Sequence, residues 1–268
     1  MKLRFTIIIL LVWTMLSCSP ERKLAKRFVE VAPKPSLLVL MPAYVFKEDL
    51  KMKGLEEGDY DSTIKTIVLD KLNDSILLSK FKMTYLKQLQ QYDVNIYDEA
   101  TIDDFMKLDS NAWVVNLSQV ELQEYETVFT DREEFFGVEY TTEVPLNGIN
   151  SAFWFEFSQV NAPENRKPEI MFSANDLYDQ FDGKFIFDIF SGQMNYQLLI
   201  DTVTVEDFYR QIDFSARLFA GYTFDYLMNS FITTHISDKE QSGNYFRNDP
   251  FRKKLFITVE DKFIPLDQ

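Results

Sequence analysis

Hydrophobic residues in the first 110 positions of this 268-residue chain fall in short runs or at helical spacing. Ser36 to Pro42 is an apolar run closed by proline, which indicates a buried strand. Thr63 to Tyr92 is typical of helix, because its apolar positions recur three and four residues apart. The polar stretch Asn73 to Ser75 can divide this segment into two helices. One helix face is predicted to carry Leu78, Phe81, Tyr85, Leu86 and Leu89.

The segments around this helix are shorter. Residues 47–63 are charged and contain Gly54 and Gly58, so they predict a loop. Asp93 to Tyr97 predicts a short strand. Thr101 with Asp104 predicts a capping box at the start of a short helix, since the two side chains can satisfy each other's free N–H groups.

From Asn111 onward the hydrophobic period changes to two, the repeat of a strand with one buried face. Phe153, Phe155 and Phe157 are the clearest example, with Trp154 and Glu156 between them. Thr130 to Arg132 and Asn147-Gly148 predict turns between long antiparallel strands. Further strands are predicted at residues 168–173, 184–190 and 195–201, the last two joined across Ser191-Gly192-Gln193.

A long helix is predicted from Phe208 to Ile236, opened by a capping box of Thr204 and Asp207. Its small residues Ala216, Ala220 and Gly221 allow a close approach to a neighbour, which we expect to be the sheet face with the three phenylalanines. A last strand is predicted at residues 255–259. One helix face is predicted to carry Phe208, Ile212, Phe219, Tyr226 and Leu227.

The order of these elements predicts a mixed α/β (α+β) fold. It would have a mixed sheet with helices packed on it, long antiparallel strands in the middle and a long C-terminal helix. We expect residues 36–268 to form a single domain.

The N-terminus has the pattern of a secretory signal, residues 1–17. Lys2 and Arg4 precede an apolar run from Phe5 to Leu16. As a helix this run would be about 18 Å long, whereas a membrane-spanning helix needs about twenty residues. A basic head and a short apolar body are typical of a cleaved signal.

Met15, Leu16 and Ser17 before the single cysteine, Cys18, resemble the cleavage motif of bacterial lipoprotein precursors, although Leu16 departs from its usual small residue. The resemblance covers residues 1–20. It implies cleavage before Cys18, acylation of that residue and anchoring in the outer membrane of a Gram-negative bacterium, facing the periplasm or the cell surface. The other interpretation is plain secretion, which would leave an unpaired thiol in an oxidising compartment.

Charge limits the possible partners. The formal net charge of −14 argues against nucleic acid and anionic lipid as partners, because both are polyanions. Residues 18–35 differ from the rest, since they are basic and contain Pro20, Pro33 and Pro35. They predict a tether that either touches lipid headgroups or is a solvated leash. Its cations are Arg22, Lys23, Lys26, Arg27 and Lys34, and a second basic cluster comprises Arg247, Arg252, Lys253 and Lys254.

Catalytic residue types are scarce. His235 is the only histidine and falls at the end of the long helix, where a cation complements the helix dipole. We therefore expect a local hydrogen bond there rather than a catalytic base. One histidine and no free cysteine do not supply the common zinc sites, and the eight scattered glycines form no phosphate loop. The sequence thus predicts no metal, no cofactor and no catalytic residue.

Carboxylates leave one enzymatic alternative open. Glu156 and Asp188 both interrupt apolar strands and could serve a hydrolase, although alternation places them on outward faces. Three short segments resemble the acceptor motif for O-linked glycans in some Gram-negative envelope proteins. They are Asp61-Ser62-Thr63, Asp74-Ser75-Ile76 and Asp201-Thr202-Val203.

The lipid anchor and the opening strand–helix–strand order resemble the small α/β lipoproteins that act as accessories in envelope assembly and transport. This resemblance implies a non-enzymatic protein, anchored in a membrane and bound to an envelope protein partner. A glycan-binding or carbohydrate-processing surface lipoprotein, using aromatic rings or a carboxylate pair, is the alternative. The 25 Phe, 13 Tyr and 3 Trp residues are compatible with either.

Overall fold

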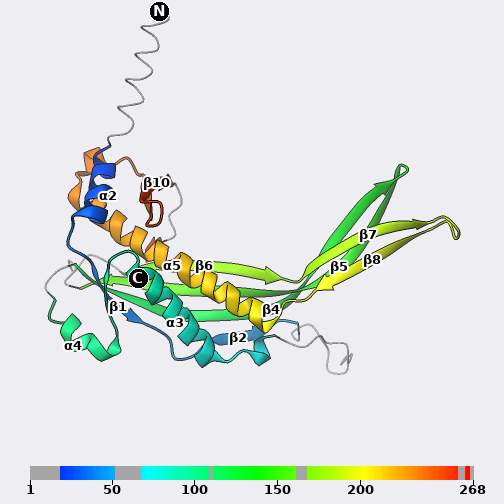
Figure 1. Cartoon of the computed structure of the whole chain (residues 1–268), viewed down its shortest axis with the longest axis horizontal. Helices are drawn as coiled ribbons and strands as arrows, with labels where there is room; N and C mark the ends of the chain where they lie inside the picture. Colours follow the sequence, from blue (N-terminus) through cyan, green and yellow to red (C-terminus); the bar gives the residue numbers. More distant parts are fainter. Residues whose placement is uncertain (1–18, 52–67, 109–110, 161–167, 259–262, 266–268) are drawn as a thin grey trace, which may run out of the picture.

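The computed structural model describes residues 19–51, 68–108, 111–160, 168–258 and 263–265, and these form a body with one long projecting arm (Figure 1). The predicted signal peptide, Cys18 and Asp61-Ser62-Thr63 lie outside the described residues.

A seven-stranded mixed sheet forms the body, in the order β11-β6-β5-β4-β1-β3, with β2 beside β4. β4 pairs antiparallel with β5, and β5 with β6, whereas β1 runs parallel to both β3 and β4. This arrangement confirms the predicted fold class. The strands are β1 (Ser36–Leu40), β2 (Phe46–Asp49), β3 (Asn95–Tyr97), β4 (Ala112–Phe135), β5 (Val138–Gln159), β6 (Glu169–Tyr178) and β11 (Phe263–Pro265).

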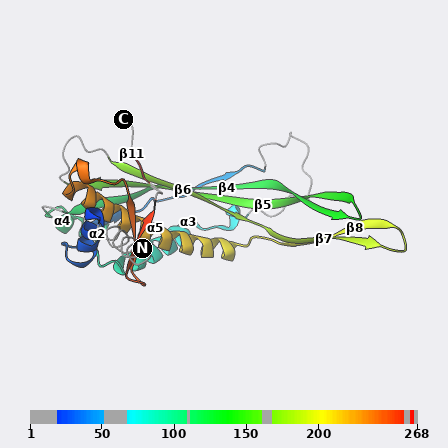
Figure 2. The same cartoon turned by 90° about the horizontal axis from the view of Figure 1, so that it is seen from above.

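Two helices, α3 (Asp74–Gln90) and α5 (Val205–His235), cover one face of this sheet (Figure 2). The period-two phenylalanines point toward them. The ring of Phe81 on α3 lies 5.3 Å from that of Phe153, and the ring of Phe219 on α5 lies 5.0 Å from it. The same two helices are joined by a hydrogen bond between the hydroxyls of Tyr85 and Thr223, 2.7 Å apart. The core therefore lies between the sheet and this helical layer.

One of the two predicted capping boxes is confirmed, because Thr204 and Asp207 form the box that opens α5. The other was wrong, because the reciprocal box is made by Asp98 and Thr101. It opens η3 (Glu99–Thr101) one turn earlier than expected, ahead of α4 (Ile102–Phe105). The polar stretch at Asn73 does interrupt the helical segment, since Asn73 accepts a hydrogen bond from the Ile76 N–H and begins α3 after the short 3-10 helix η2 (Leu69–Lys71).

Residues 18–35 were predicted to be a tether, and this has to be revised for α2 (Pro20–Glu30). The ring of Phe28 packs 5.5 Å from that of Phe224 on α5. Glu21 is buried and accepts hydrogen bonds from the backbone N–H and the hydroxyl of Ser242. Although the segment is basic and flanked by prolines, α2 has an apolar face that packs on the body. Only residues 31–35 therefore connect it to β1.

Both predicted turns in the middle of the chain were wrong. Thr130 to Arg132 lies within β4, where Asp131 pairs with Thr142. Asn147-Gly148 lies within β5, and the rings of Tyr125 and Tyr178 lie so close over Gly148 that a side chain there would clash with them. The glycine serves close packing rather than a turn, and the chain reverses at Phe136-Gly137 instead.

Three smaller elements complete the fold. The predicted loop at 47–63 overlaps β2, whose Lys47 pairs with Leu122 of β4, while residues 52–63 are not described. The second predicted hairpin is confirmed as β7 (Gln180–Asp188) and β8 (Gln193–Asp201). The C-terminal region has a further hairpin, β9 (Tyr245–Asp249) and β10 (Lys254–Thr258), before β11, where only one last strand was expected.

Candidate functional site

The most distinctive feature of the molecule is an arm made of two β-ribbons. We define the arm as residues 127–146 of β4 and β5 together with residues 180–201 of β7 and β8. Both ribbons leave the body in the same direction and lie side by side, and the turn of the β7–β8 ribbon extends beyond that of the β4–β5 ribbon (Figures 1 and 2). An isolated two-stranded ribbon is marginally stable in water, so each ribbon needs the other.

Aromatic rings hold the ribbons together. The ring centroids of Phe129 and Phe181 are 5.0 Å apart, and Phe135 and Phe187 stack at 6.2 Å. Pairs of this kind contribute about 0.5–1.5 kcal/mol each beyond the area they bury. A hydrogen bond of 2.7 Å from the Tyr196 hydroxyl to Asp131 also crosses between the ribbons.

A buried carboxylate fixes the base of the arm. Asp179 immediately precedes β7, and it accepts hydrogen bonds from the N–H of Asn147 at 3.0 Å and the N–H of Val203 at 2.8 Å. These donors belong to β5 and to the segment that follows β8. One side chain therefore ties both ends of the β7–β8 ribbon to the body.

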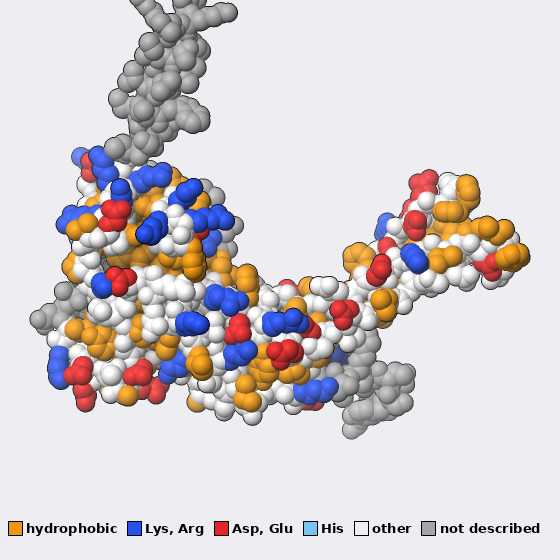
Figure 3. Space-filling model, viewed as in Figure 1, with side chains coloured by type: hydrophobic (Ala, Val, Ile, Leu, Met, Phe, Trp, Pro, Cys, Tyr) orange, Lys and Arg blue, Asp and Glu red, His pale blue; other side chains and the backbone are white. Residues whose placement is uncertain are grey.

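The tip of the arm is apolar and open to solvent. Phe136 is 90% exposed, and Phe190 is fully exposed in the neighbouring turn. Ile189 in the same turn is also exposed. Figure 3 shows hydrophobic side chains gathered at this end of the molecule. Exposed apolar groups on a projection are typical of a surface that is covered by another molecule.

Carboxylates lie close behind the apolar tip. Glu134 and Glu139 face each other one pair before the turn, and Arg132 lies 3.8 Å from Glu139. Asp188 accepts hydrogen bonds from the Ser191 hydroxyl and the Phe190 N–H, which lower the pKa of its carboxyl. The apolar tip is thus bordered by negative charge.

The structure separates the carboxylates named from the sequence. Asp188 closes the β7–β8 turn at the tip of the arm, whereas Glu156 pairs with Asn116 and Ile170 in the body. Glu156 and Asp188 therefore do not form an acid pair.

His235 is where the sequence placed it, at the end of α5. Its Nδ1 lies 2.8 Å from the carbonyl oxygen of Phe231, and its ring stacks on that phenyl ring. This is the local hydrogen bond that was expected.

A different pair of acids, Glu21 and Glu169, lines a cleft of about 530 Å³ near the end of α5. Both oxygens of Glu21 are engaged by Ser242, so this carboxylate holds α2 to the body. Within the described part of the chain, no group of three or more His, Cys, Asp or Glu side chains could hold a metal. Of the described glycan-acceptor segments, Ser75 and Thr202 are exposed.

The sequence did not reveal the arm. Its signal was the alternation of apolar and polar residues that recurs between residues 111 and 159, where the turn residues are weak. Pro145 marks where β5 extends beyond β6, since pairing with β6 begins only at Gly148. Proline is tolerated at such an edge because no neighbour needs its N–H.

Comparison with models of known protein families gives no match, and comparison with curated proteins gives no relative of significant similarity. Among the described residues, none of the helices combines the length and apolar content needed to cross a membrane.

Proposed function

We propose that this protein is a lipid-anchored, non-enzymatic accessory subunit of a cell-envelope assembly, and that the arm binds its protein partner. The observation that carries the proposal is the apolar tip, where Phe136 and Phe190 extend into solvent from a braced double ribbon. An unpaired ribbon would be too flexible to present such a surface. The aromatic pairs and Asp179 hold it in place, which reduces the entropy that binding must overcome.

The chemistry of the tip indicates the chemistry of its partner. Two exposed phenylalanines fit an apolar cleft, and Glu134, Glu139 and Asp188 fit cations around its rim. A membrane is a poorer match, because these carboxylates would have to approach lipid headgroups.

The position of α2 supports a membrane-anchored subunit. Ser19 caps this helix one residue after Cys18, and Phe28 and Glu21 fasten it to the body. An acyl anchor on Cys18 would therefore be held beside the body rather than at the end of a leash. The start of α2 and the tip of the arm lie at opposite ends of the long axis, but both point toward the upper side of the view in Figure 1, so the partner would lie at the same membrane.

The proposal is tested with the double variant Phe136→Ser/Phe190→Ser and the matched control Phe214→Ser, which changes an exposed phenylalanine on α5. Both proteins are solubilised from the envelope and the proteins that co-purify are identified by mass spectrometry. We expect the double variant to lose its partner at an unchanged melting temperature and the control to keep it. Equal recovery from the double variant would refute the role of the arm.

A photo-crosslinking amino acid at position 136 distinguishes a protein partner from lipid. We expect a discrete cross-linked protein, and labelling of lipid alone would overturn the proposal. The anchor is tested separately with Cys18→Ala, which we expect to remain unprocessed or to be released from the membrane. Membrane retention with the wild-type mature N-terminus would contradict acylation at Cys18.

A further inference from the structure

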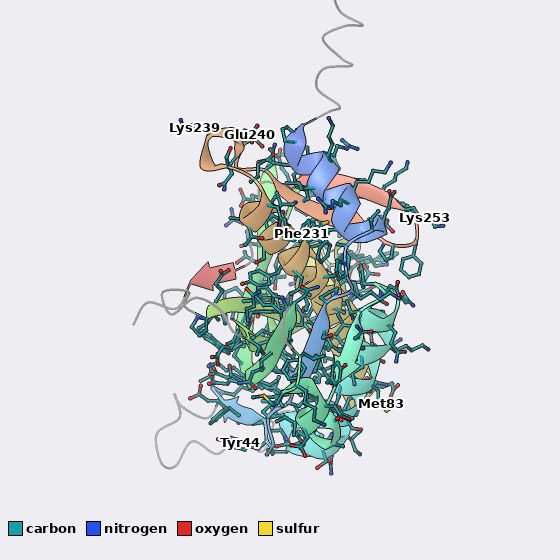
Figure 4. All side chains as sticks on the ribbon, turned by 90° about the vertical axis from the view of Figure 1, so that its left-hand side faces the viewer. Tyr44, Met83, Phe231, Lys239, Glu240 and Lys253 are labelled. Carbon is teal, nitrogen blue, oxygen red and sulfur yellow. The ribbon has the colours of Figure 1, made fainter. Side chains whose placement is uncertain are left out.

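A second surface lies at the opposite end of the molecule from the arm. α2 and the β9–β10 hairpin border a cleft of about 610 Å³, and Tyr92 at the end of α3 also lines it. Figure 4 shows Lys253 on this hairpin, beside α2. The two basic clusters of the sequence are separated by more than 200 residues, yet both contribute to this cleft.

The rim of the cleft is positively charged. Arg22 and Lys26 line it from α2, and Lys253 and Lys254 line it from the hairpin. Two acids are also present, but Glu30 lies 3.8 Å from Lys26, and Asp93 is bound by Lys34. Within the described residues Arg22, Lys253 and Lys254 form no ion pair. This is a cationic site on a chain whose formal net charge is −14 (Figure 3).

The lining of the cleft is partly apolar. Val29, Phe224 and Leu255 contribute to it. Beside it, Phe251 is 73% exposed in the turn of the hairpin and is followed by Arg252 and Lys253. An exposed ring next to several cations is typical of protein surfaces that meet the interface of a membrane.

From this combination we infer that the cleft binds an anionic lipid, with the phosphate at the cationic rim and the first part of an acyl chain on the apolar lining. Cationic side chains complement the phosphate, and Val29 and Leu255 complement the hydrocarbon. The negative net charge of the whole chain disfavours anionic lipid as a partner, but the rim of this cleft is positively charged and attracts it. The inference goes beyond the proposed function and does not involve the arm.

The test uses native mass spectrometry of the purified full chain in detergent, with phosphatidylglycerol and phosphatidylcholine of the same acyl chains added in parallel. We expect phosphatidylglycerol to be retained in preference. Arg22→Glu/Lys254→Glu should lower the affinity for phosphatidylglycerol more than roughly 30-fold, since each lost cation near an anionic surface contributes a factor of about five and the two added carboxylates repel the phosphate. Lys71→Glu/Lys184→Glu makes the same change of charge at exposed positions away from the cleft and should have little effect.

Three results would overturn the inference. They are equal retention of the two lipids by the wild type, an equal loss of binding in the control variant, or unchanged binding in Arg22→Glu/Lys254→Glu. Glycerol phosphate at the same concentration should not displace the lipid, and displacement would overturn the role of the apolar lining. Phe136→Ser/Phe190→Ser should bind lipid normally, so failure of the arm proposal can be told apart from failure of this one.

Discussion

Gly183→Ala tests whether the two ribbons of the arm act as one unit. Gly183 lies on β7 directly beneath Tyr196, and a methyl group there would overlap the hydroxyl and the adjoining ring carbon of that tyrosine. The ring would have to move, which would break its 2.7 Å hydrogen bond to Asp131. The substitution removes a link between the ribbons without touching the body of the protein.

The expected magnitude follows from the contacts. A hydrogen bond to a charged acceptor contributes about 1.5–3 kcal/mol, and partial exposure reduces this to about 1–2 kcal/mol here. The population in which the ribbons separate should therefore rise by a factor of about 5–30. Without the overlap, Gly→Ala would instead stabilise the protein by about 0.4–1 kcal/mol, because it restricts the unfolded chain. Overlap with Tyr196 therefore predicts that Gly183→Ala destabilises the arm, whereas restriction of the unfolded chain alone predicts that it stabilises the protein.

The separation can be measured by electron–electron double resonance between spin labels at Glu139→Cys and Gln193→Cys, one on each ribbon, in a Cys18→Ala background. We expect a narrow distance distribution in the parent protein and a broader one in Gly183→Ala. Lys184→Ala changes the neighbouring exposed residue and should leave the distribution narrow. An equally narrow distribution in Gly183→Ala would refute the reasoning.

Three further predictions concern the body. Glu124→Gln should lower the free energy of unfolding by about 3–5 kcal/mol, because buried Glu124 pairs with Lys51, which is only 10% exposed; a change below about 1 kcal/mol in urea unfolding would contradict this. Burial raises the pKa of Asp225 from 3.8 to about 7. Its folded form therefore keeps a proton that the unfolded chain has lost, so stability from this group is complete below about pH 4 and is lost as the pH rises through 7. Asp225→Asn should remove this decline, whereas parallel stability curves for variant and wild type from pH 4 to 8 would show that Asp225 does not cause it. Ala220→Phe should cost about 1–3 kcal/mol or more, because Ala220 is fully buried, and Ala220→Ser should cost less; an unchanged melting temperature for Ala220→Phe would indicate that this face of α5 is open.

Local signals in the sequence were enough to predict the longest elements of the body, among them α3, α5 and the central strands of the sheet. The Thr204–Asp207 box places the start of α5 because both partners lie within one turn of backbone. The alternation of Phe153, Phe155 and Phe157 identifies the buried face of β5, since the period of a strand fixes which side chains share a face. These contacts depend on residues close in sequence or on a strict repeat, so the pattern alone reveals them.

Features that depend on residues far apart in the sequence could not be predicted from local patterns. Gly148 resembled a turn residue until Tyr178, thirty residues later, was found packed over it, and Gly183 is required by Tyr196 of the next strand. A period of two identifies a strand's faces but neither its length nor its partner.

The cleft and the arm could not be predicted from the sequence for the same reason. Each brings together residues that are far apart in the chain, Arg22 and Lys253 in the cleft and Asp131 and Tyr196 in the arm. Although α2, β2 and β9 were missed, sequence by itself determined the long helices and most of the strands, because backbone geometry and burial periodicity are local. Only the tertiary structure decided which of them meet, because packing depends on the shape and charge of side chains brought together from distant parts of the chain.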